Sequence, residues 1–336
     1  MMNTNIHPAR EHRARTQYRR NTLRAALLGL GLALILLLSG TGGVSAQEVM
    51  ASSLRTSQQR QKKEAHNKAT VRYMYSVIFD QGKTELVSKF FAENYIQHDP
   101  TQPNGRQGVI DFVRAKLAAQ SRPWFMVKHI LADGDFVAVH VQVTPTPSDE
   151  FSGQAVLDLY RLDHGLIVEH WSSIQDVPPT SASGNSMFST LYPNPPARVS
   201  EQQEAANREL VRSLADRLFN HGDLSVLDQY WAGPNYIQHN PMAPNGADAL
   251  KGFLSLDPPS FSQMNTKYAV ADGNYVLLFQ HMVFPGADPN NEFAGFAVAD
   301  LYHVVNQKVV EHWDILQPVP ATSVSGNSMF SSLYQH

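Results

Sequence analysis

The sequence contains the same module twice, and this internal repeat limits the folds that the chain can adopt. Three blocks each occur in two copies and in the same order: YIQHDPTQPNG and YIQHNPMAPNG from Tyr95 and Tyr236, EHWSSIQDVPP and EHWDILQPVP from Glu169 and Glu311, and SGNSMFSTLY and SGNSMFSSLY from Ser183 and Ser325. The offset is nearly constant, at 141 residues between His98 and His239 and 142 between His170 and His312. Each copy is therefore one folding unit of roughly 130 residues, a common size for a domain.

The length and composition fit two such domains behind a leader. A chain of 336 residues that is 43% hydrophobic and 10% aromatic can bury two cores. The formal net charge of −3 gives no electrostatic footprint for nucleic acid, so no nucleic-acid partner is expected. The sequence has no Cys, and the fold must therefore rest on its cores without disulfides.

The first 46 residues have the form of a secretory signal. Several arginines precede an apolar run from Ala25 to Leu38, and Val44-Ser45-Ala46 forms a small-x-small cleavage site. The apolar run is shorter than the roughly 20 residues that a spanning helix needs, which favours cleavage after Ala46 over an uncleaved membrane anchor. We therefore expect an exported, secreted or extracytoplasmic protein, which stays membrane-anchored if the signal is not cleaved. Residues 47–66 are polar and are expected to form a tether.

Hydrophobic spacing predicts the elements of each domain. Apolar residues recur on one helix face in both copies: Val71, Met74, Ile78 and Phe79, then Val211, Leu214, Leu218 and Phe219. A short helix and a third helix follow in each copy, and residues 129–145, 154–171 and 268–285 are typical of hairpins with turns at Gly. We predict α+β domains over 67–193 and 201–336, joined by a linker at 194–200. Each would pack three helices on a curved antiparallel sheet.

The motifs resemble a known domain family. YIQHNP with a downstream NG, ADG before a strand, DLYR followed by a turn and IVEHW, and the GNSMF segment are together similar to SnoaL-like domains of the polyketide-cyclase type, within the nuclear-transport-factor-2-like superfamily. The resemblance implies two tandem cone-shaped domains, each with a mostly apolar pocket. It also implies proton transfer without a cofactor, by an Asp or His in the pocket. Family members include cyclases, isomerases, dehydratases, epoxide hydrolases and catalytically silent binding modules, so the reaction must be argued from the site.

Strand alternation groups the candidate site residues. Residues two apart in a strand point the same way, so His312 and Asp314 share one face. In the first copy, a three-residue loop at 163–165 would pair Leu162 with Leu166 and set Asp158 opposite His170. The corresponding pair in the second copy is Asp300 and His312. Ser172 stands in the first copy where Asp314 stands in the second.

These positions define the predicted sites. In the second domain the catalytic residues would be Asp314, His312, Asp300 and His239. The resemblance matches Asp314 to the general base, with His312 and Asp300 orienting it and His239 donating to the oxyanion. The pocket of the first domain would contain His98, Asp158 and His170. The alternative for each His–Asp pair is a buried structural hydrogen bond.

Other residues are assigned to packing or excluded from metal binding. Trp171, Trp313, Glu169 and Glu311 are expected on the outer faces of the sheets, where they would pair the two copies within one chain or two chains in a homodimer. A metal site of His98, His140 and His170 lacks a ligand pair of short spacing such as HExxH, so no metal is predicted. No phosphate loop, dinucleotide fingerprint or nucleophile elbow appears in the sequence.

The sequence thus predicts a cofactor-free acid/base enzyme, an aldol-type cyclase or an isomerase, acting on a small apolar carbonyl compound. The alternative is a non-catalytic module that binds a small hydrophobic ligand or mediates assembly. An open pocket containing Asp314 and His312 would favour the enzyme. A pocket filled by Phe253, Phe279 or Tyr302 would favour the structural role.

Overall fold

The computed structural model describes residues 45–119, 122–193, 199–256 and 263–333. The chain divides into two compact units, 1–59 and 60–336, and the second unit contains both repeats. Most of the signal expected at 1–46 and most of the linker expected at 194–200 lie outside the described residues. Among the helices of the described residues, none combines the length and apolar character needed to cross a membrane.

The polar segment expected to be a tether is helical. Helix α2 runs from Ala46 to Met74 and has many Gln, Lys, Arg, Glu and Ala residues, which are strong helix formers. Its last turns carry the predicted apolar stripe, and Val71 and Met74 are buried in the core of the first repeat. The second repeat begins with the matching helix α5, Glu201–Ala215, which buries Val211 and Leu214.

Both repeats use a similar series of elements, in which η1 and η3 are π-helices and η2 and η4 are short 3-10 helices. The 3-10 helix precedes α3 in the first repeat and follows α6 in the second. In the first, α2 is followed by η1 (Tyr75–Asp80), η2 (Thr84–Leu86), α3 (Val87–Phe90), β1 (Phe91–Gln97), α4 (Arg106–Ala118), β2 (Trp124–Asp133), β3 (Phe136–Thr144), β4 (Gln154–Asp163) and β5 (Leu166–Asp176). In the second, α5 is followed by η3 (Asp216–Asn220), α6 (Ser225–Tyr230), η4 (Gly233–Asn235), β6 (Ile237–Gln238), α7 (Ala247–Leu256), β7 (Gln263–Asp272), β8 (Tyr275–Val283), β9 (Phe296–Val305) and β10 (Lys308–Pro318). The α+β architecture predicted from the sequence is confirmed.

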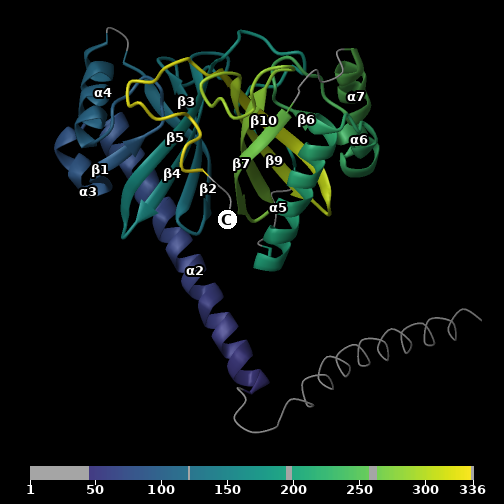
Figure 1. The fold of residues 1–336 in the computed structure, drawn as a ribbon, viewed down its shortest axis with the longest axis horizontal. Helices are drawn as coiled ribbons and strands as arrows, with labels where there is room; N and C mark the ends of the chain where they lie inside the picture. The colour runs from purple at the N-terminus through teal and green to yellow at the C-terminus, as the bar shows by residue number, and fades with distance from the viewer. Residues whose placement is uncertain (1–44, 120–121, 194–198, 257–262, 334–336) are drawn as a thin grey trace, which may run out of the picture. The chain divides into compact units, whose positions relative to one another are not determined.

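Each repeat forms an open five-stranded sheet, in the orders β1-β5-β4-β3-β2 and β6-β10-β9-β8-β7 (Figure 1). The sheets are mixed and not wholly antiparallel as expected, because the strand of the YIQ block lies parallel to the strand of the EHW block. Gln97 is paired with His170, and Gln238 with His312. This edge pairing brings the YIQH and EHW motifs of each repeat together.

The register of the last hairpin differs from the prediction. The β4–β5 turn has two residues, His164 and Gly165, with φ of 49° and 81°, and an irregularity between Arg161 and Leu162 adds one more residue to β5. Tyr160 is therefore the residue opposite His170, and Asp158 is two positions further along. The turn and the bulge each shift the pairing by one residue. Because the two shifts add to an even number, Asp158 stays on the predicted face.

The same geometry holds in the second repeat. Asn306 and Gln307 form the β9–β10 turn with φ of 51° and 62°, so Gln307 takes the left-handed conformation that Gly165 takes in the first repeat. Tyr302 is opposite His312, and Asp300 is opposite Asp314. Two carboxylates therefore face each other across this hairpin.

The outer faces of the two sheets share one buried cluster. Trp171 and Trp313 lie in it with residues of both sheets, including Leu157 and Leu301. Gln175 Oε1 accepts from the backbone N–H of Leu316 at 2.9 Å, and Gln317 Oε1 accepts from that of Ile174 at 2.8 Å. These reciprocal bonds explain why both copies of the EHW block carry a Gln.

The segments after each sheet cross to the other repeat. We call residues 183–193 the first coda and 325–333 the second coda. The Trp171 indole donates to the Ser331 carbonyl and the Trp313 indole to the Ser189 carbonyl, both at 3.0 Å. The yellow second coda is seen over the strands of the first repeat in Figure 1. Each repeat is thus completed by the coda of the other.

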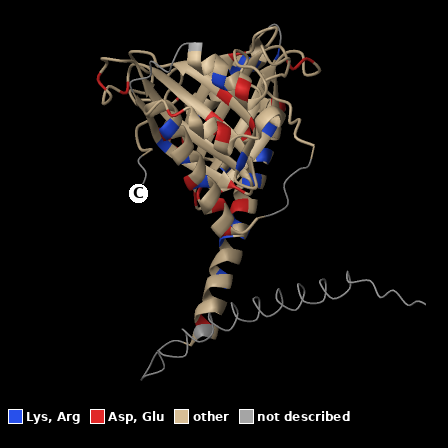
Figure 2. Ribbon diagram, turned by 90° about the vertical axis from the view of Figure 1, so that its right-hand side faces the viewer, with Lys and Arg blue, Asp and Glu red and all other residues tan. Residues whose placement is uncertain are grey.

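Charged residues of both signs are interspersed along the repeats (Figure 2). Several of them join the repeats: Lys68 is 2.6 Å from Asp272, and Arg208 pairs with Asp133. Asp133 also accepts from the backbone N–H of Ala271. These contacts hold the β2–β3 and β7–β8 hairpin ends against each other.

Candidate active site

The second repeat has a cavity of about 150 Å³ between its helices and the inner face of its sheet. Its walls are mainly apolar, and the polar side chains that line it come from the YIQH block and from β9 and β10: Tyr236, Gln238, Asn240, Asp300, Tyr302, His312 and Asp314. Phe253 and Tyr302 line the cavity, whereas Phe279 is buried in the cluster between the repeats. These three residues therefore leave an open pocket, and His312 and Asp314 both line it.

The orientation of His312 is fixed by Gln238 and Asp300. Gln238 Oε1 accepts from the backbone N–H of Asn240, so it must be the carbonyl end of the amide. His312 Nδ1 lies 3.0 Å from this oxygen and therefore carries a proton that it donates. Nε2 lies 3.0 Å from Asp300 Oδ1, and Gln280 donates to Asp300 Oδ2 at 2.5 Å. His312 and Asp300 thus share a second proton.

Asp314 is the carboxylate with a free oxygen. Asn240 donates to its Oδ2 at 2.6 Å, while Oδ1 is buried and has no hydrogen-bond partner among the described residues. Burial raises the pKa of Asp314 to about 6; the His312 charge opposes this rise, and the Asp300 carboxylate adds to it. Near neutral pH this carboxyl group can therefore both accept and return a proton.

The charge of His312 is matched to its neighbours. Burial disfavours the imidazolium, but the hydrogen bond that His312 donates to Asp300 and the charges of Asp314 and Asp300 outweigh burial and raise the pKa of His312. A cationic His312 between two carboxylates offsets part of their repulsion. The Tyr302 ring lies 4.6 Å from the His312 ring, and burial raises the pKa of Tyr302 well above its usual value. Tyr302 therefore remains a phenol and a proton donor.

The first repeat has a related and larger cavity of about 240 Å³. His170 Nδ1 is 2.9 Å from Gln97 Oε1 and Nε2 is 2.8 Å from Asp158 Oδ1, which repeats the arrangement around His312. The hydrogen bond expected across each hairpin between His and Asp is thus present. The second oxygen of Asp158 accepts from the Tyr75 hydroxyl. Ser172 lies opposite Asp158 and lines the cavity in the position that Asp314 takes in the second repeat.

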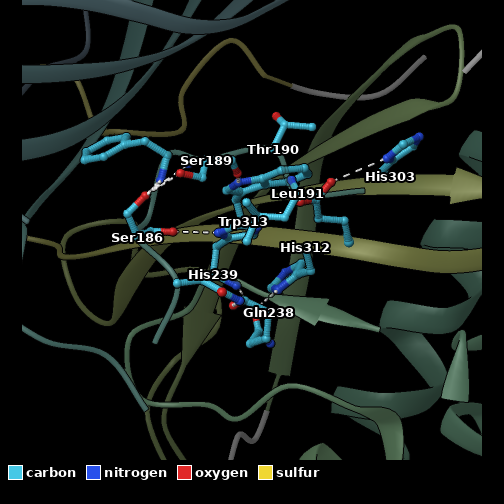
Figure 3. A network of polar contacts seen from close by, with 12 residues as sticks. Ser186, Ser189, Thr190, Leu191, Gln238, His239, His303, His312 and Trp313 are labelled. Carbon is cyan, nitrogen blue, oxygen red and sulfur yellow. Dashed lines mark hydrogen bonds and ion pairs between the residues drawn. The ribbon is translucent and has the colours of Figure 1, made fainter. Parts of the chain in front are cut away.

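His98 and His239 lie outside the cavities, which differs from the prediction. His239 Nε2 is 3.0 Å from Glu311, its Nδ1 is 2.6 Å from the Ser186 carbonyl of the first coda, and its ring is stacked on Trp313 (Figure 3). The reason is strand alternation: Gln238 faces the cavity, so the next residue faces the other side. His239 can therefore give no hydrogen bond to an oxyanion in the pocket.

His98 repeats this arrangement, with Nε2 at 2.9 Å from Glu169, Nδ1 at 2.8 Å from the Ser328 carbonyl and a ring stacked on Trp171. Glu169 and Glu311 accordingly lie on the outer faces of their sheets, as their spacing predicts. Burial would raise the pKa of Glu311, but hydrogen bonds from His239 and the Leu191 backbone, together with His303 at 3.6 Å, lower it to about 2. The His–Glu pairs thus hold each coda on the opposite repeat.

The sequence-based prediction missed several residues that complete the site. Asn240 holds Asp314, Gln280 holds Asp300, Gln238 orients His312, and Tyr236 and Tyr302 line the pocket. The sequence contained one signal for Asn240: the two YIQH blocks differ at this position, where the first block has Asp99 and the second has Asn240. Nothing in the local sequence connects Gln280 with Asp300.

One group of side chains among the described residues could hold a cation. A ligand atom of each of Asp300, His312 and Asp314 lies within 4.8 Å of the others. Because Nδ1 of His312 keeps its proton for Gln238, a cation would have to bind at Nε2 and displace the proton shared with Asp300. The hydrogen bonds of this group therefore suit proton transfer better than metal binding. His140, considered above for a metal site, contacts His129 at 3.2 Å between their Nδ1 atoms, away from His170.

The fold and site define an α+β domain with a mostly apolar pocket that contains a His–Asp pair, present twice. A family model described as SnoaL-like polyketide cyclase matches residues 69–181 and 209–322. The chain belongs to the SnoaL-like polyketide cyclase family, with one family domain in each repeat.

Solved structures of related proteins match about one repeat each. A putative polyketide cyclase from Bacillus cereus ATCC 10987 is 22% identical over 34% of this chain and 78% of its own, with a TM-score of 0.31. A putative isomerase of the SnoaL-like family from Agrobacterium tumefaciens str. C58 is 18% identical over 32% of this chain and 97% of its own, with a TM-score of 0.28. A comparison with curated proteins gave no match.

Proposed function

We propose that the second repeat is a cofactor-free acid/base catalyst that moves a proton on a small apolar carbonyl compound, in an isomerisation or an aldol-type cyclisation. The observation that carries the proposal is the unpaired, buried Oδ1 of Asp314, which lies in an apolar pocket. A general base works best when its pKa lies near the operating pH, and the pKa of about 6 for Asp314 meets this condition.

The residues have separate roles in this proposal. Asp314 Oδ1 removes a proton from the carbon next to the carbonyl group, and the electron pair moves to the carbonyl oxygen. The Tyr302 hydroxyl donates a hydrogen bond to the oxyanion that forms. Protonated Asp314 then returns its proton to another carbon of an isomerisation substrate. In a cyclisation the enolate carbon attacks a second carbonyl carbon, and protonated Asp314 gives its proton to the alkoxide oxygen that forms. Asn240 and the His312–Asp300 pair hold Asp314 and balance its charge throughout.

The pocket size limits the substrate. A dry cavity of about 150 Å³ is known to accept a benzene-sized molecule, and this cavity has the same volume. Small cyclic ketones are therefore suitable probes. We further propose that the protein is exported, supported by the leader of residues 1–46; N-terminal sequencing of the mature protein tests this and separates cleavage after Ala46 from an uncleaved anchor.

The proposal predicts a pH-dependent exchange rate. Wild-type protein in D₂O is incubated with cyclohexanone or 2-indanone, and loss of the protons next to the carbonyl is followed by NMR after subtraction of the buffer rate. Since the base form of Asp314 is the active one, the rate should rise about tenfold per pH unit below about pH 6 and level off above it. Absence of protein-dependent exchange with both ketones, or a rate without this inflection, would reject the proposed base.

Tyr302→Phe should lower the exchange rate by a factor of roughly 10² at pH 7, because removal of one oxyanion donor typically has an effect of this size. The Tyr302 hydroxyl has no hydrogen-bond partner among the described residues. The variant should therefore fold normally. Tyr160→Phe, the same change in the first repeat, is the matched control and should leave exchange unaffected. A Tyr302→Phe variant with wild-type rate would show that another group supports the oxyanion.

A further inference from the structure

The two pockets carry an additional carboxylate at different places, on the last strand of the sheet in the second repeat and on the turn after the edge strand in the first. In the second repeat the acid is Asp314 on β10, and the amide Asn240 is on the turn after β6. In the first repeat the acid is Asp99 on the turn after β1, and Ser172 is on β5. The turns are equivalent: Asp99 accepts from the Thr101 backbone N–H at 2.8 Å, as Asn240 does from that of Met242 at 2.7 Å. Each pocket therefore has a carboxylate besides that of its His–Asp pair.

The Asp99 carboxylate is held more firmly than that of Asp314. It accepts from the Thr101 backbone N–H, from the Thr101 hydroxyl at 2.7 Å and from Gln102 Nε2 at 2.9 Å. A carboxylate offers about four lone-pair sites, so roughly one remains for a ligand. The three donors fix the orientation of the Asp99 side chain, which can accept a hydrogen bond from a ligand. The first pocket is suited to binding a hydrogen-bond donor.

Two further polar groups in the first pocket are available to a ligand. The Ser172 side chain is 2% exposed and lines the cavity, and its hydroxyl has no hydrogen-bond partner among the described residues. The Tyr95 hydroxyl accepts from Gln97 Nε2 at 3.1 Å, and its own proton has no acceptor there. Tyr95 is also 2% exposed. The Ser172 hydroxyl can therefore donate to or accept from a ligand in the cavity, and the Tyr95 hydroxyl can donate to one.

The aromatic side chains and the one lysine that line the first cavity limit the class of ligand further. Six aromatic rings besides Tyr95 line the cavity: Tyr75, Phe79, Phe91, Phe112, Phe125 and Tyr160. The volume of about 240 Å³ exceeds that of the second pocket, which leaves room for one substituted ring. Lys116 also lines the cavity, with its Nζ 5.3 Å from the centre of the Phe112 ring, and has no ion-pair partner among the described residues. This cation is available to an anionic group of the ligand.

We propose that the first repeat is a binding site for a small aromatic acid that carries a hydroxyl group, and that it binds this ligand without proton transfer. The ring lies among the aromatic side chains, the hydroxyl group donates to Asp99 and contacts Ser172, and the carboxylate pairs with Lys116. The two pockets of the chain thus differ in the ligands that they bind. This assignment is independent of the activity proposed for the second repeat.

The test is calorimetric titration of the full chain at pH 7 with 2-, 3- and 4-hydroxybenzoate, with benzoate and benzyl alcohol as reference probes. At least one hydroxybenzoate should bind at least tenfold more tightly than benzoate. Ser172→Ala and Asp99→Asn should each remove most of this difference, because both act on the hydroxyl group. Asn at the equivalent position 240 shows that the turn accommodates the amide. Lys116→Gln should weaken the binding of benzoate and of the hydroxybenzoates by roughly three- to tenfold and leave the binding of benzyl alcohol unchanged.

Asp314→Asn separates this inference from the proposed function. Hydroxybenzoate affinity should be the same in this variant as in wild type, and Ser172→Ala should keep the exchange activity of the second pocket. The inference is overturned if no hydroxybenzoate binds at millimolar concentration, if affinity is unchanged in both Ser172→Ala and Asp99→Asn, or if Asp314→Asn abolishes binding. In the last case the ligand would occupy the second pocket.

Discussion

Asp314→Asn is expected to lower the exchange rate of the second pocket by a factor of roughly 10²–10⁴, the range that a positioned general base usually contributes. The amide has nearly the same shape as the carboxylate, and its oxygen can still accept from Asn240 Nδ2, now 2.6 Å from Oδ2. Only the basic site is lost. The change is measured as ketone exchange in D₂O at pH 7.

The matched control is Asp99→Asn, which makes the same chemical change at the turn of the first pocket. Ketone exchange by the second pocket should persist in the Asp99→Asn variant, because Asp99 is held by three donors and lies in the other repeat. Retention of the wild-type rate in Asp314→Asn would place the base elsewhere. Loss of exchange in both variants would indicate that the two pockets act together.

The same variant should be more stable than wild type at neutral pH. The pKa of Asp314 rises from 3.8 to about 6 on folding, so between these values the folded state binds more protons than the unfolded state. Stability therefore falls as the pH rises through this window. Each pKa unit corresponds to about 1.4 kcal/mol, which predicts that Asn gains roughly 2–3 kcal/mol over Asp at pH 7 and almost nothing at pH 4.

Urea unfolding of both proteins at pH 4 and pH 7 measures this difference, because titrating groups that do not interact with Asp314 cancel in the comparison. His312 does not cancel, since the Asp314 charge raises its pKa, and its contribution is part of the measured difference. A larger advantage for Asn at pH 4 than at pH 7 would contradict the assigned direction of the pKa shift. Greater stability together with lost exchange would identify Asp314 as a group kept for chemistry at the expense of the fold.

Trp313→Ala should lower the free energy of unfolding by about 3–5 kcal/mol, the usual effect of truncating a large buried aromatic side chain. Trp313 is 2% exposed, is stacked on His239 at 4.8 Å and donates to the Ser189 carbonyl at 3.0 Å. Its loss leaves a cavity in the cluster shared by the repeats and frees one attachment of the first coda. Chemical denaturation monitored by circular dichroism gives the change.

Trp171→Ala should have a similar effect, because Trp171 occupies the equivalent position in the first repeat. Trp124→Ala is the control, since Trp124 is 52% exposed and its removal should change stability by about 0.5 kcal/mol or less. A loss below about 1 kcal/mol for Trp313→Ala would mean that the shared cluster contributes little to the fold.

The sequence determined much of the fold by local rules. Apolar spacing identified the helix stripe that includes Val71 and Val211, and Gly turns identified the hairpins, because both signals depend on residues that are near one another in the chain. The family followed from the paired motifs. The polar segment 47–66 was the exception, since it is rich in strong helix formers but has no apolar face, which is the pattern that usually indicates a helix.

The candidate site was predicted in part. Alternation along β10 correctly placed His312 and Asp314 on one face, because the period of a strand is a local property. The exact partner across the hairpin was wrong by two residues, since neither the two-residue turn nor the bulge has a distinct sequence signal. The hydrogen bond between His312 and Asp300 survived this error because an even shift preserves the face.

The tertiary structure alone decided the chemistry of the two pockets. The parallel pairing of β6 with β10 turns Gln238 into the pocket and His239 away from it, and this pairing joins residues 74 positions apart. Asn240 reaches Asp314 across the same separation and leaves one carboxylate oxygen free. Contacts between distant segments depend on how the whole domain closes, whereas a repeat, a helix stripe and a turn are set by neighbours in the chain. The sequence by itself therefore established a tandem family fold, and the packing established which carboxylates line its two pockets and which oxygen is left unpaired.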